Sequence, residues 1–363
     1  MAYTERPGGL SELARYGFVD LSGTMQKLDK LVELVGDSGR SAIASLSKSP
    51  DPDQALNALL GFAEADRATV KNILKREDSA TRLCQLLGAS AALTDFLRRQ
   101  PACFAEFEKP VSALDSAADL NRQLVQSVES LLVSGFESQK AWTALRIEYR
   151  RQLLKIAIFD LSAADPQLAQ PIVAAALADL AGAAIEAGLR VARAELALST
   201  EFGVFDPREI DDTRLTVIAM GKCGARELNY ISDVDVIYVG QSANEAETSH
   251  QRAVEISTKL ATRMMRAMDG TAPEPGLWQV DPNLRPEGKS GALVRTLESH
   301  VSYYDRWAES WEFQALLKAR PLAGDMELGR EYVNALAPKV WASASRENFV
   351  ESAQRMRERV TEH

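Results

Sequence analysis

The sequence predicts an α+β protein that is mostly α-helical. Apolar residues return at spacings of three and four from about Leu10 to Leu198, which is the pattern of amphipathic helices. Short apolar, β-branched runs typical of strands occur only after Glu201. We therefore expect a helical domain over residues 1–200, a module with a small β-sheet over residues 201–330, and the start of a C-terminal helical region over residues 331–363.

The helices of the first half are predicted from their ends and their faces. Prolines and aspartates in SKSPDPDQALNALL directly precede an apolar periodic run, as at a helix start, and Pro101 ends a later helix. From Arg146 to Leu161, apolar residues share one face and basic residues lie elsewhere, which predicts a half-buried helix. The Ala- and Leu-rich stretch from Ile172 to Leu198 predicts a long helix packed on more than one side.

A change of composition at Glu201 marks the expected boundary between the helical domain and the module. A segment with a glycine and a proline leads there into LTVIAM, a run of strand length. A second strand is expected over Val234–Val239, a helix over Ala246–Met268 and a third strand from Leu277 to Val280. This order of elements predicts a small layer of sheet with a helical cover.

After Thr296 the pattern is again helical, with interruptions at Pro321 and Gly324. The last residues, SRENFVESAQRMRERVTEH, continue a charged helical pattern without a stop signal. We therefore expect the chain to be a fragment of a longer protein.

Composition excludes several classes of function. The 363 residues carry a formal charge of -9, which argues against broad nucleic-acid binding, because neutralising phosphates needs a surplus of Lys and Arg. No run of about 18 apolar residues and no secretory pattern is found, so we expect a cytoplasmic protein that is not in a membrane. The cysteines are far apart and form no CxxC pair, and the three histidines are scattered, which leaves oxygen as the ligand of any metal.

The stretch from Met220 to Val239, MGKCGARELNYISDVDVIYV, carries the most chemical information. It places Asp233 and Asp235 at the entrance of the second strand. Residues two apart on a strand point to the same face, so both carboxylates can reach one point in space. Two such charges repel each other unless a cation lies between them. Mg²⁺ is the natural occupant, with Mn²⁺ as the alternative, because hard divalent ions prefer carboxylate, water and phosphate oxygens.

Neighbouring residues extend this pair into an expected phosphate site. A third carboxylate, Asp281, appears at the end of the third predicted strand. The turn with Gly221 and Gly224 lets backbone N–H groups approach a phosphate, and Ser232 can add a hydroxyl donor. An Asp-x-Asp taken alone is most often a pair of solvated acids, and it is the strand, the glycine turn and Asp281 that favour a metal site.

The segment GKCGARELNYISDVDV resembles the GKxGxxELNxxSDxD signature of the glutamine synthetase adenylyltransferase/adenylyl-removing family. The resemblance continues through LRPEGKSGAL and SWEFQALLKARPLAGD, and upstream through DFLRRQPACF and RRQLLKIAIFDL. It spans roughly Leu97 to Met326, while residues 1–90 are uninformative. It implies a nucleotidyltransferase-type module with a small mixed β-sheet and helices.

Family proteins contain two copies of this unit, and the resemblance implies which copy is present. The amino-terminal copy reads ELNxxSDxD and the carboxy-terminal copy tends to read ELGxxSDxD, so Asn229 favours the amino-terminal, adenylyl-removing copy, and Met1 agrees with that. The implied reaction is phosphorolysis, in which inorganic phosphate attacks adenylyl-tyrosine on glutamine synthetase and releases ADP. Adenylylated glutamine synthetase, phosphate, ADP and a PII-type regulatory protein are the implied partners, in the control of nitrogen metabolism.

The resemblance also implies roles for individual residues. Asp233, Asp235 and Asp281 are expected to bind the metal and to act in catalysis, and Asp281 also to assist proton movement. The candidates for phosphate or nucleotide binding are Gly221, Lys222, Gly224, Ser232, Arg285, Lys289, Lys318 and Arg320. Each basic residue has a surface salt bridge as its alternative role. One departure matters, because Pro282 and Asn283 interrupt the family's usual VDxRLRP and remove an expected arginine.

Two other hypotheses stay open on the sequence. The chain could be the forward, ATP-dependent adenylyltransferase half of the same enzyme. It could also be a noncatalytic helical module that binds glutamine synthetase or a regulatory protein. For Tyr304, Trp307 and Trp311, which are spaced three and four apart, we expect a place in a helix core rather than stacking on a nucleotide.

Overall fold

The structure of the protein, a computed structural model, describes residues 10–133, 136–198, 205–245 and 248–343, with residues 351, 354 and 358. The chain divides into two compact units. Unit 1 comprises Met1–Leu114 and Arg150–Gln170, and unit 2 comprises Asp115–Tyr149 and Pro171–His363. The described part is mainly helical with one small mixed sheet in unit 2, which confirms the expected α+β, mostly α, fold class.

Unit 1 is helical in its described residues. Its elements are α1 (Leu10–Arg15), α2 (Leu21–Val35), α3 (Asp37–Leu46), α4 (Pro52–Ala65), α5 (Arg67–Leu74), α6 (Glu77–Ala89), α7 (Ala91–Arg99) and the 3₁₀ helix η1 (Pro101–Phe107). The predicted helix start is confirmed at α4, where the side chain of Asp51 accepts a hydrogen bond from the N–H of Gln54 at 2.9 Å and Pro52 is the first helical residue. The predicted stop at Pro101 is confirmed by the end of α7.

Unit 2 contains the sheet and most of the longer helices. Its elements are α8 (Ala117–Glu129), α11 (Pro207–Asp212), β1 (Thr213–Ala219), α12 (Gly221–Gly224), β2 (Val234–Ser242), α13 (His250–Asp269), β3 (Val280–Asp281), η2 (Gly288–Ser290), β4 (Val294–Arg295), α14 (Leu297–Arg306), α15 (Ser310–Leu316), β5 (Arg320–Gly324) and α16 (Met326–Ala342). The long helices α9 (Ser138–Leu161) and α10 (Pro166–Leu198) have residues in both units.

The sheet of unit 2 is built around the two predicted apolar strands. Its order is β3-β2-β1-β5, and β4 pairs with β2 as well. Strand β1 runs antiparallel to β2 and β5, whereas β2 runs parallel to β3 and β4. Almost every residue of β1 and β2 is buried, as their unbroken apolar character predicts.

Two expectations about the strands are wrong. The third strand begins at Val280 rather than at Leu277, because the chain before it is a loop. The interruption at Pro321 and Gly324 is strand β5 and not a break between helices, since this segment pairs with β1. Gly324, at φ +77°, donates its N–H to the side chain of Glu186 on α10 at 2.7 Å.

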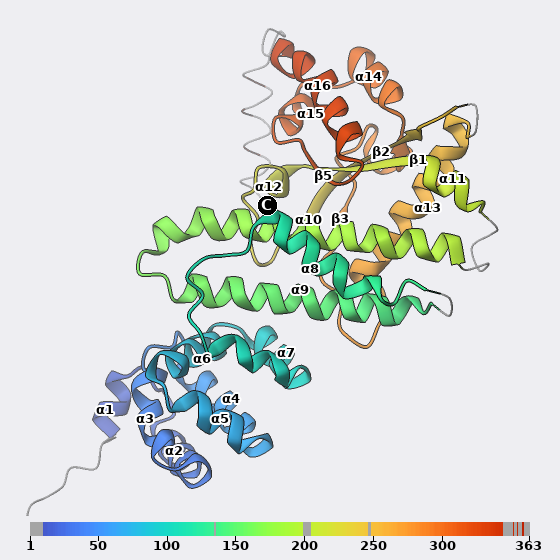
Figure 1. The fold of residues 1–363 in the computed structure, drawn as a ribbon. Coiled ribbons are helices and arrows are strands. Elements are labelled where there is room, and N and C mark those ends of the chain that lie inside the picture. The colour runs from blue at the N-terminus through green and yellow to red at the C-terminus, as the bar shows by residue number, and fades with distance from the viewer. Residues whose placement is uncertain are drawn as a thin grey trace, which may run out of the picture. The chain divides into compact units, whose positions relative to one another are not determined.

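Helices cover both faces of the sheet (Figure 1). On one face, α14, α15 and α16 pack on β1 and β2 through a core that includes Ile218, Ile237, Tyr304, Phe313 and Tyr332. On the other face lie α10 and α13, which approach each other so closely that a Cβ on Gly188 would lie 2.8 Å from the Cε atom of Met268. The sheet is therefore a central layer enclosed on both sides.

Helix α10 is apolar enough, by length and composition, to cross a membrane. Its most apolar window of 18 residues has a mean hydropathy of 1.7, but 78% of that window is buried inside the protein. Burial of this kind is the pattern of a core helix. This confirms the prediction from the sequence that a long helix here is packed on more than one side.

Two predicted side-chain environments are wrong. Arg146 does not lie on a solvated face but is fully buried, where it donates hydrogen bonds to the carbonyl oxygens of Ala267 and Glu274 near the C-terminus of α13. The carbonyl oxygen of Ala267 lies in the last turn of α13, where carbonyls have no partner within the helix, which explains the demand for a donor. In the aromatic series, Tyr304 is buried, but Trp307 is 74% exposed because α14 ends at Arg306 and the three rings share no helix.

Parts of the predicted organisation lie outside the described residues. These are the boundary at Glu201 and the charged pattern beyond residue 343, apart from single positions. The division into regions 1–200, 201–330 and 331–363 stays a prediction.

A core substitution tests the packing of the sheet. Ile237 is fully buried between β2 and α14–α16, so we expect Ile237→Ala to lower the free energy of unfolding of unit 2 by about 2–5 kcal/mol. All five tryptophans belong to unit 2, so denaturation followed by tryptophan fluorescence reports on this unit. The same change at Ile231, which is 95% exposed, is the control and should shift the midpoint little. Equal shifts for both variants would contradict this packing.

Candidate functional site

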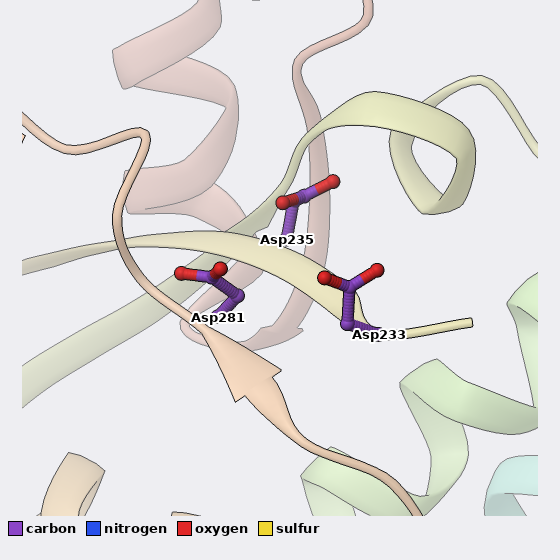
Figure 2. Close-up of side chains that lie close together, drawn as sticks. All are labelled: Asp233, Asp235 and Asp281. Atoms are coloured by element: carbon purple, nitrogen blue, oxygen red, sulfur yellow. The ribbon is translucent and has the colours of Figure 1, made fainter. Parts of the chain in front are cut away.

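Three aspartates converge at one end of the sheet. The carboxylates of Asp233, Asp235 and Asp281, here called the carboxylate trio, each offer an oxygen atom, and these atoms lie within 4.8 Å of one another. Figure 2 shows the three side chains on the same side of neighbouring strands. The trio could hold a metal ion.

The register of the parallel pair β2 and β3 brings the trio together. Asp235 lies opposite Asp281 in this register, and Asp233 precedes Asp235 by two residues just before β2 begins. Asp281 is oriented by the chain that follows it, because one of its carboxylate oxygens accepts the N–H of Asn283 at 2.7 Å. This contact uses the backbone N–H of residue 283 and so does not depend on the departure from the family pattern at that position.

The electrostatics of the trio favour a cation. Burial, together with the charges of Asp233 and Asp281, raises the pKa of Asp235 to about 6, against a smaller opposing effect of Lys222. The basic side chains Arg226 and Lys318 pair with Asp179 and Glu227 rather than with the trio. Three oxygen ligands, converging and partly exposed, fit Mg²⁺ or Mn²⁺, which keep water and phosphate oxygens as their other ligands.

The glycine turn, which is α12 with Gly221–Gly224, passes close to the trio. Gly221 has φ +51°, and a Cβ atom there would lie 2.4 Å from Oδ2 of Asp235. A Cβ atom on Gly224 would lie 2.0 Å from the carbonyl oxygen of Lys318. Space therefore requires the glycine at position 224, where the close atom belongs to the backbone. The positive φ requires the glycine at position 221, where an added Cβ atom would displace the carboxylate of Asp235. The structure brings the predicted turn and the predicted carboxylates together.

Two of the predicted phosphate ligands are engaged with backbone carbonyls. Arg320 donates from Nε to Gly224 at 3.2 Å and from a terminal nitrogen to Cys223 at 3.0 Å, so it supports the glycine turn. Arg285 donates to the carbonyl oxygens of Pro282, Lys289 and Gly291, so it closes the loop that follows Asp281. Phosphate binding by these two arginines stays a prediction.

The other predicted ligands are exposed or half-buried. Lys222 is exposed and close enough to lower the pKa of Asp235, and Lys289 is exposed on the loop after Asp281. Ser232 is half-buried next to Asp233. Lys318 is exposed and forms an ion pair with Glu227 at 2.8 Å, which is the alternative role weighed for it.

Sequence reasoning missed one pair of residues beside the glycine turn. Arg226 follows the turn with φ 59° and binds both carboxylate oxygens of Asp179 on α10. The side chain of Asp179 is only 9% exposed. The available signal was a single acid in the apolar run AALADLAGAA, where a charge needs a partner.

The repulsion within the trio predicts an unusual stabilising mutation. A folded-state pKa above the ordinary value means that Asp235 destabilises the metal-free protein above about pH 6, and that this effect disappears as the pH falls towards 4. We expect Asp235→Asn to raise the Tm of unit 2 in EDTA at pH 7.5 by about 2–4 °C, or roughly 1 kcal/mol after allowance for solvent exposure.

The same variant should lose its response to metal. Mg²⁺ should raise the Tm of the wild-type protein at pH 7.5, and should raise that of Asp235→Asn much less, because a ligand is gone. A lower Tm of Asp235→Asn in EDTA, or an undiminished response to Mg²⁺, would contradict the cation site.

A methyl group on the glycine turn should disturb the trio without removing a charge. We expect Gly221→Ala to weaken Mg²⁺ binding by about tenfold or more, measured by titration, because the new Cβ displaces the carboxylate of Asp235. Gly288→Ala is the matched control. Gly288 also has a positive φ of +55°, but a Cβ atom there would lie 3.7 Å from its nearest neighbour, the carbonyl oxygen of Asn283. Equal losses in both variants would assign the effect to backbone strain alone.

Comparison with known proteins identifies the family of this chain. Residues 80–335 match the family described as glutamate-ammonia ligase adenylyltransferase. The chain is 52% identical over 357 residues to the bifunctional glutamine synthetase adenylyltransferase/adenylyl-removing enzyme of Leifsonia xyli, a match that covers 98% of this chain and 35% of that protein.

Proteins of the same name from two other bacteria are also similar. The one from Streptomyces avermitilis is 42% identical over 363 residues, and the one from Mycobacterium avium is 42% identical over 369 residues. Each match covers 98% of this chain and 34% of the relative, so the chain spans about a third of the length of the curated relatives it matches. The resemblance seen in the motifs is confirmed, and the chain belongs to the glutamate-ammonia ligase adenylyltransferase family.

Proposed function

We propose that this chain removes adenylyl groups from glutamine synthetase by metal-dependent phosphorolysis. Inorganic phosphate attacks the adenylyl phosphorus on a tyrosine of the synthetase, a new P–O bond forms ADP, and the tyrosine oxygen leaves and takes up a proton. The convergence of the carboxylate trio beside the glycine turn is the observation that supports this proposal. Adenylylated glutamine synthetase, phosphate and a PII-type regulator are its partners, in the cytoplasm.

Asp233, Asp235 and Asp281 would hold the Mg²⁺ or Mn²⁺ ion. The ion, when bound, supplies positive charge that stabilises the phosphoryl oxygens during transfer. Without it, three carboxylates would repel the phosphates of both substrates, because all these groups are negative. The proposal therefore requires activity to depend on a divalent cation.

The remaining residues of the site have roles in binding and orientation. The N–H of Gly224 donates to the carbonyl oxygen of Met220 at 2.8 Å. The backbone amides that come before it in the glycine turn are suited to binding phosphate oxygens. Lys222, which is close enough to lower the pKa of Asp235, and Lys289, on the loop after Asp281, are exposed and can neutralise charge on phosphate or nucleotide. Positioning and charge stabilisation are the main sources of catalysis in such transfers.

The direction of the reaction is proposed from the sequence motif. Asn229 stands in ELNYISDVD, the form that resembles the adenylyl-removing copy of the family. It is exposed, four residues before Asp233. The forward adenylyltransferase reaction is the second candidate, because the relatives are named for both activities.

Two parallel incubations separate the candidates. Purified protein is mixed with adenylylated glutamine synthetase, phosphate and Mg²⁺ in one, and with unmodified synthetase, ATP and Mg²⁺ in the other. We expect ADP release in the first and no pyrophosphate release in the second. Pyrophosphate in the second alone would assign the forward reaction.

Substitution of the trio tests whether the carboxylates are catalytic. We expect Asp233→Asn and Asp281→Asn to lower kcat for ADP release by at least about 100-fold, because each removes a metal ligand and a negative charge from the site. Asp269→Asn, an exposed acid at the end of α13, is the control and should keep wild-type activity. Unchanged turnover in the trio variants would exclude the metal role of these carboxylates.

A further inference from the structure

We propose that the ion pair between Arg226 and Asp179 positions the glycine turn for the reaction, so that both are positioning residues which act through the turn and touch no substrate. This inference rests on the proposed function and deepens it. The pair ties the end of the turn to α10, a helix of the core of unit 2.

The backbone at Arg226 is the first observation. Arg226 has φ 59°, in the left-handed region that favours glycine and is unfavourable for a residue with a Cβ atom. With this conformation the chain folds back, and the N–H of Glu227 donates to the carbonyl oxygen of Lys222 at 2.8 Å. A hydrogen bond of this kind usually ends a helix in which glycine is the residue with positive φ, but here that residue is Arg226. A side-chain interaction must offset the unfavourable backbone.

The ion pair supplies that interaction. The guanidinium group of Arg226 binds Asp179 in a bidentate manner, with Nε 3.2 Å from Oδ1 and a terminal nitrogen bound to Oδ2. The side chain of Asp179 is 9% exposed, so loss of Arg226 would leave a largely buried carboxylate without its ion pair. Glycine at position 226 would relieve the backbone but would lose this anchor.

Asp179 itself is held in a fixed place. It lies on α10 near Ala181 and Ile185, which are fully buried. One turn along, a Cβ atom on Gly182 would lie 2.8 Å from a methyl carbon of Leu322, so α10 contacts β5 directly. Asp179 therefore lies on a core helix that packs directly against the sheet.

The ion pair and Arg320 hold the glycine turn from two elements. Arg320 on β5 binds the carbonyl oxygens of Cys223 and Gly224, and Arg226 joins the following residue to α10. At the opposite end of the turn, Gly221 lies against the carboxylate of Asp235. The two contacts thus determine the separation between the turn amides and the trio, which is where the phosphates are proposed to bind.

Two variants and their combination test the inference. Asp179→Asn removes the acidic partner, and Arg226→Gly removes the basic partner while keeping a residue suited to φ 59°. We expect each to lower kcat/KM for ADP release by about 10–100-fold, because a small misplacement of a binding group has effects of this size. The double variant should lose no more than the larger single loss, since both act through one interaction.

A matched control removes an ion pair elsewhere in unit 2. Glu209 and Arg252 also form a bidentate pair, with a shortest distance of 3.0 Å, next to the start of β1. The seven residues of β1 separate this pair from the glycine turn by roughly 20 Å. Glu209→Gln should keep kcat/KM within about twofold of wild type.

A second readout does not depend on activity. Hydrogen exchange of the amides from Cys223 to Leu228 should be faster in Asp179→Asn than in wild type, while the rise in Tm with Mg²⁺ should be unchanged because the trio is intact. Wild-type kcat/KM in both single variants would overturn the positioning role, and unchanged exchange would overturn the tether itself. If the wild-type protein releases no ADP, the proposed function fails, and the exchange measurement alone then decides whether the ion pair holds the turn.

Discussion

Burial of strand β2 is the constraint on which the site of unit 2 depends, because it holds three carboxylates that repel one another. Asp233, Asp235 and Asp281 would separate if their backbones were free, and they stay within 4.8 Å because two of them lie opposite each other on hydrogen-bonded strands. The backbone pairing is maintained by burial, since β2 is almost wholly enclosed by helices on both faces. The hydrophobic core thus holds charges in an arrangement that is unfavourable without a cation.

The surroundings of the trio are supported mainly by arginines bound to carbonyl oxygens. Arg320 supports the glycine turn, and Arg285 closes the loop after Asp281. Irregular segments at a site have backbone groups that no strand or helix satisfies, and a planar guanidinium with several N–H groups can satisfy more than one of them. Basic residues near a predicted phosphate site therefore include some whose main contacts are within the protein.

Local patterns in the sequence predicted those features of the structure that depend on residues close together in the chain. The two-residue spacing of Asp233 and Asp235 and the apolar runs of β1 and β2 indicated the site and its strands. Strand β5 was not predictable in this way, because a segment with Pro321 and Gly324 resembles an interruption and is a strand only through pairing with β1. The partner of Asp179 depends likewise on a contact 47 residues away. Long-range pairing was the missing information.

The pairing of β1 with β5 has a consequence for biosynthesis. Residues 216–219 lie beside residues 320–324, so about a hundred residues must leave the ribosome between the two halves of this ladder. The trio precedes β5 in the chain, but the turn beside it is supported by Arg320. A nascent chain that ends before β5 has all three aspartates and lacks the strand that braces their surroundings. The centre is therefore fully braced only after β5, and with it most of the described part of unit 2, has left the ribosome.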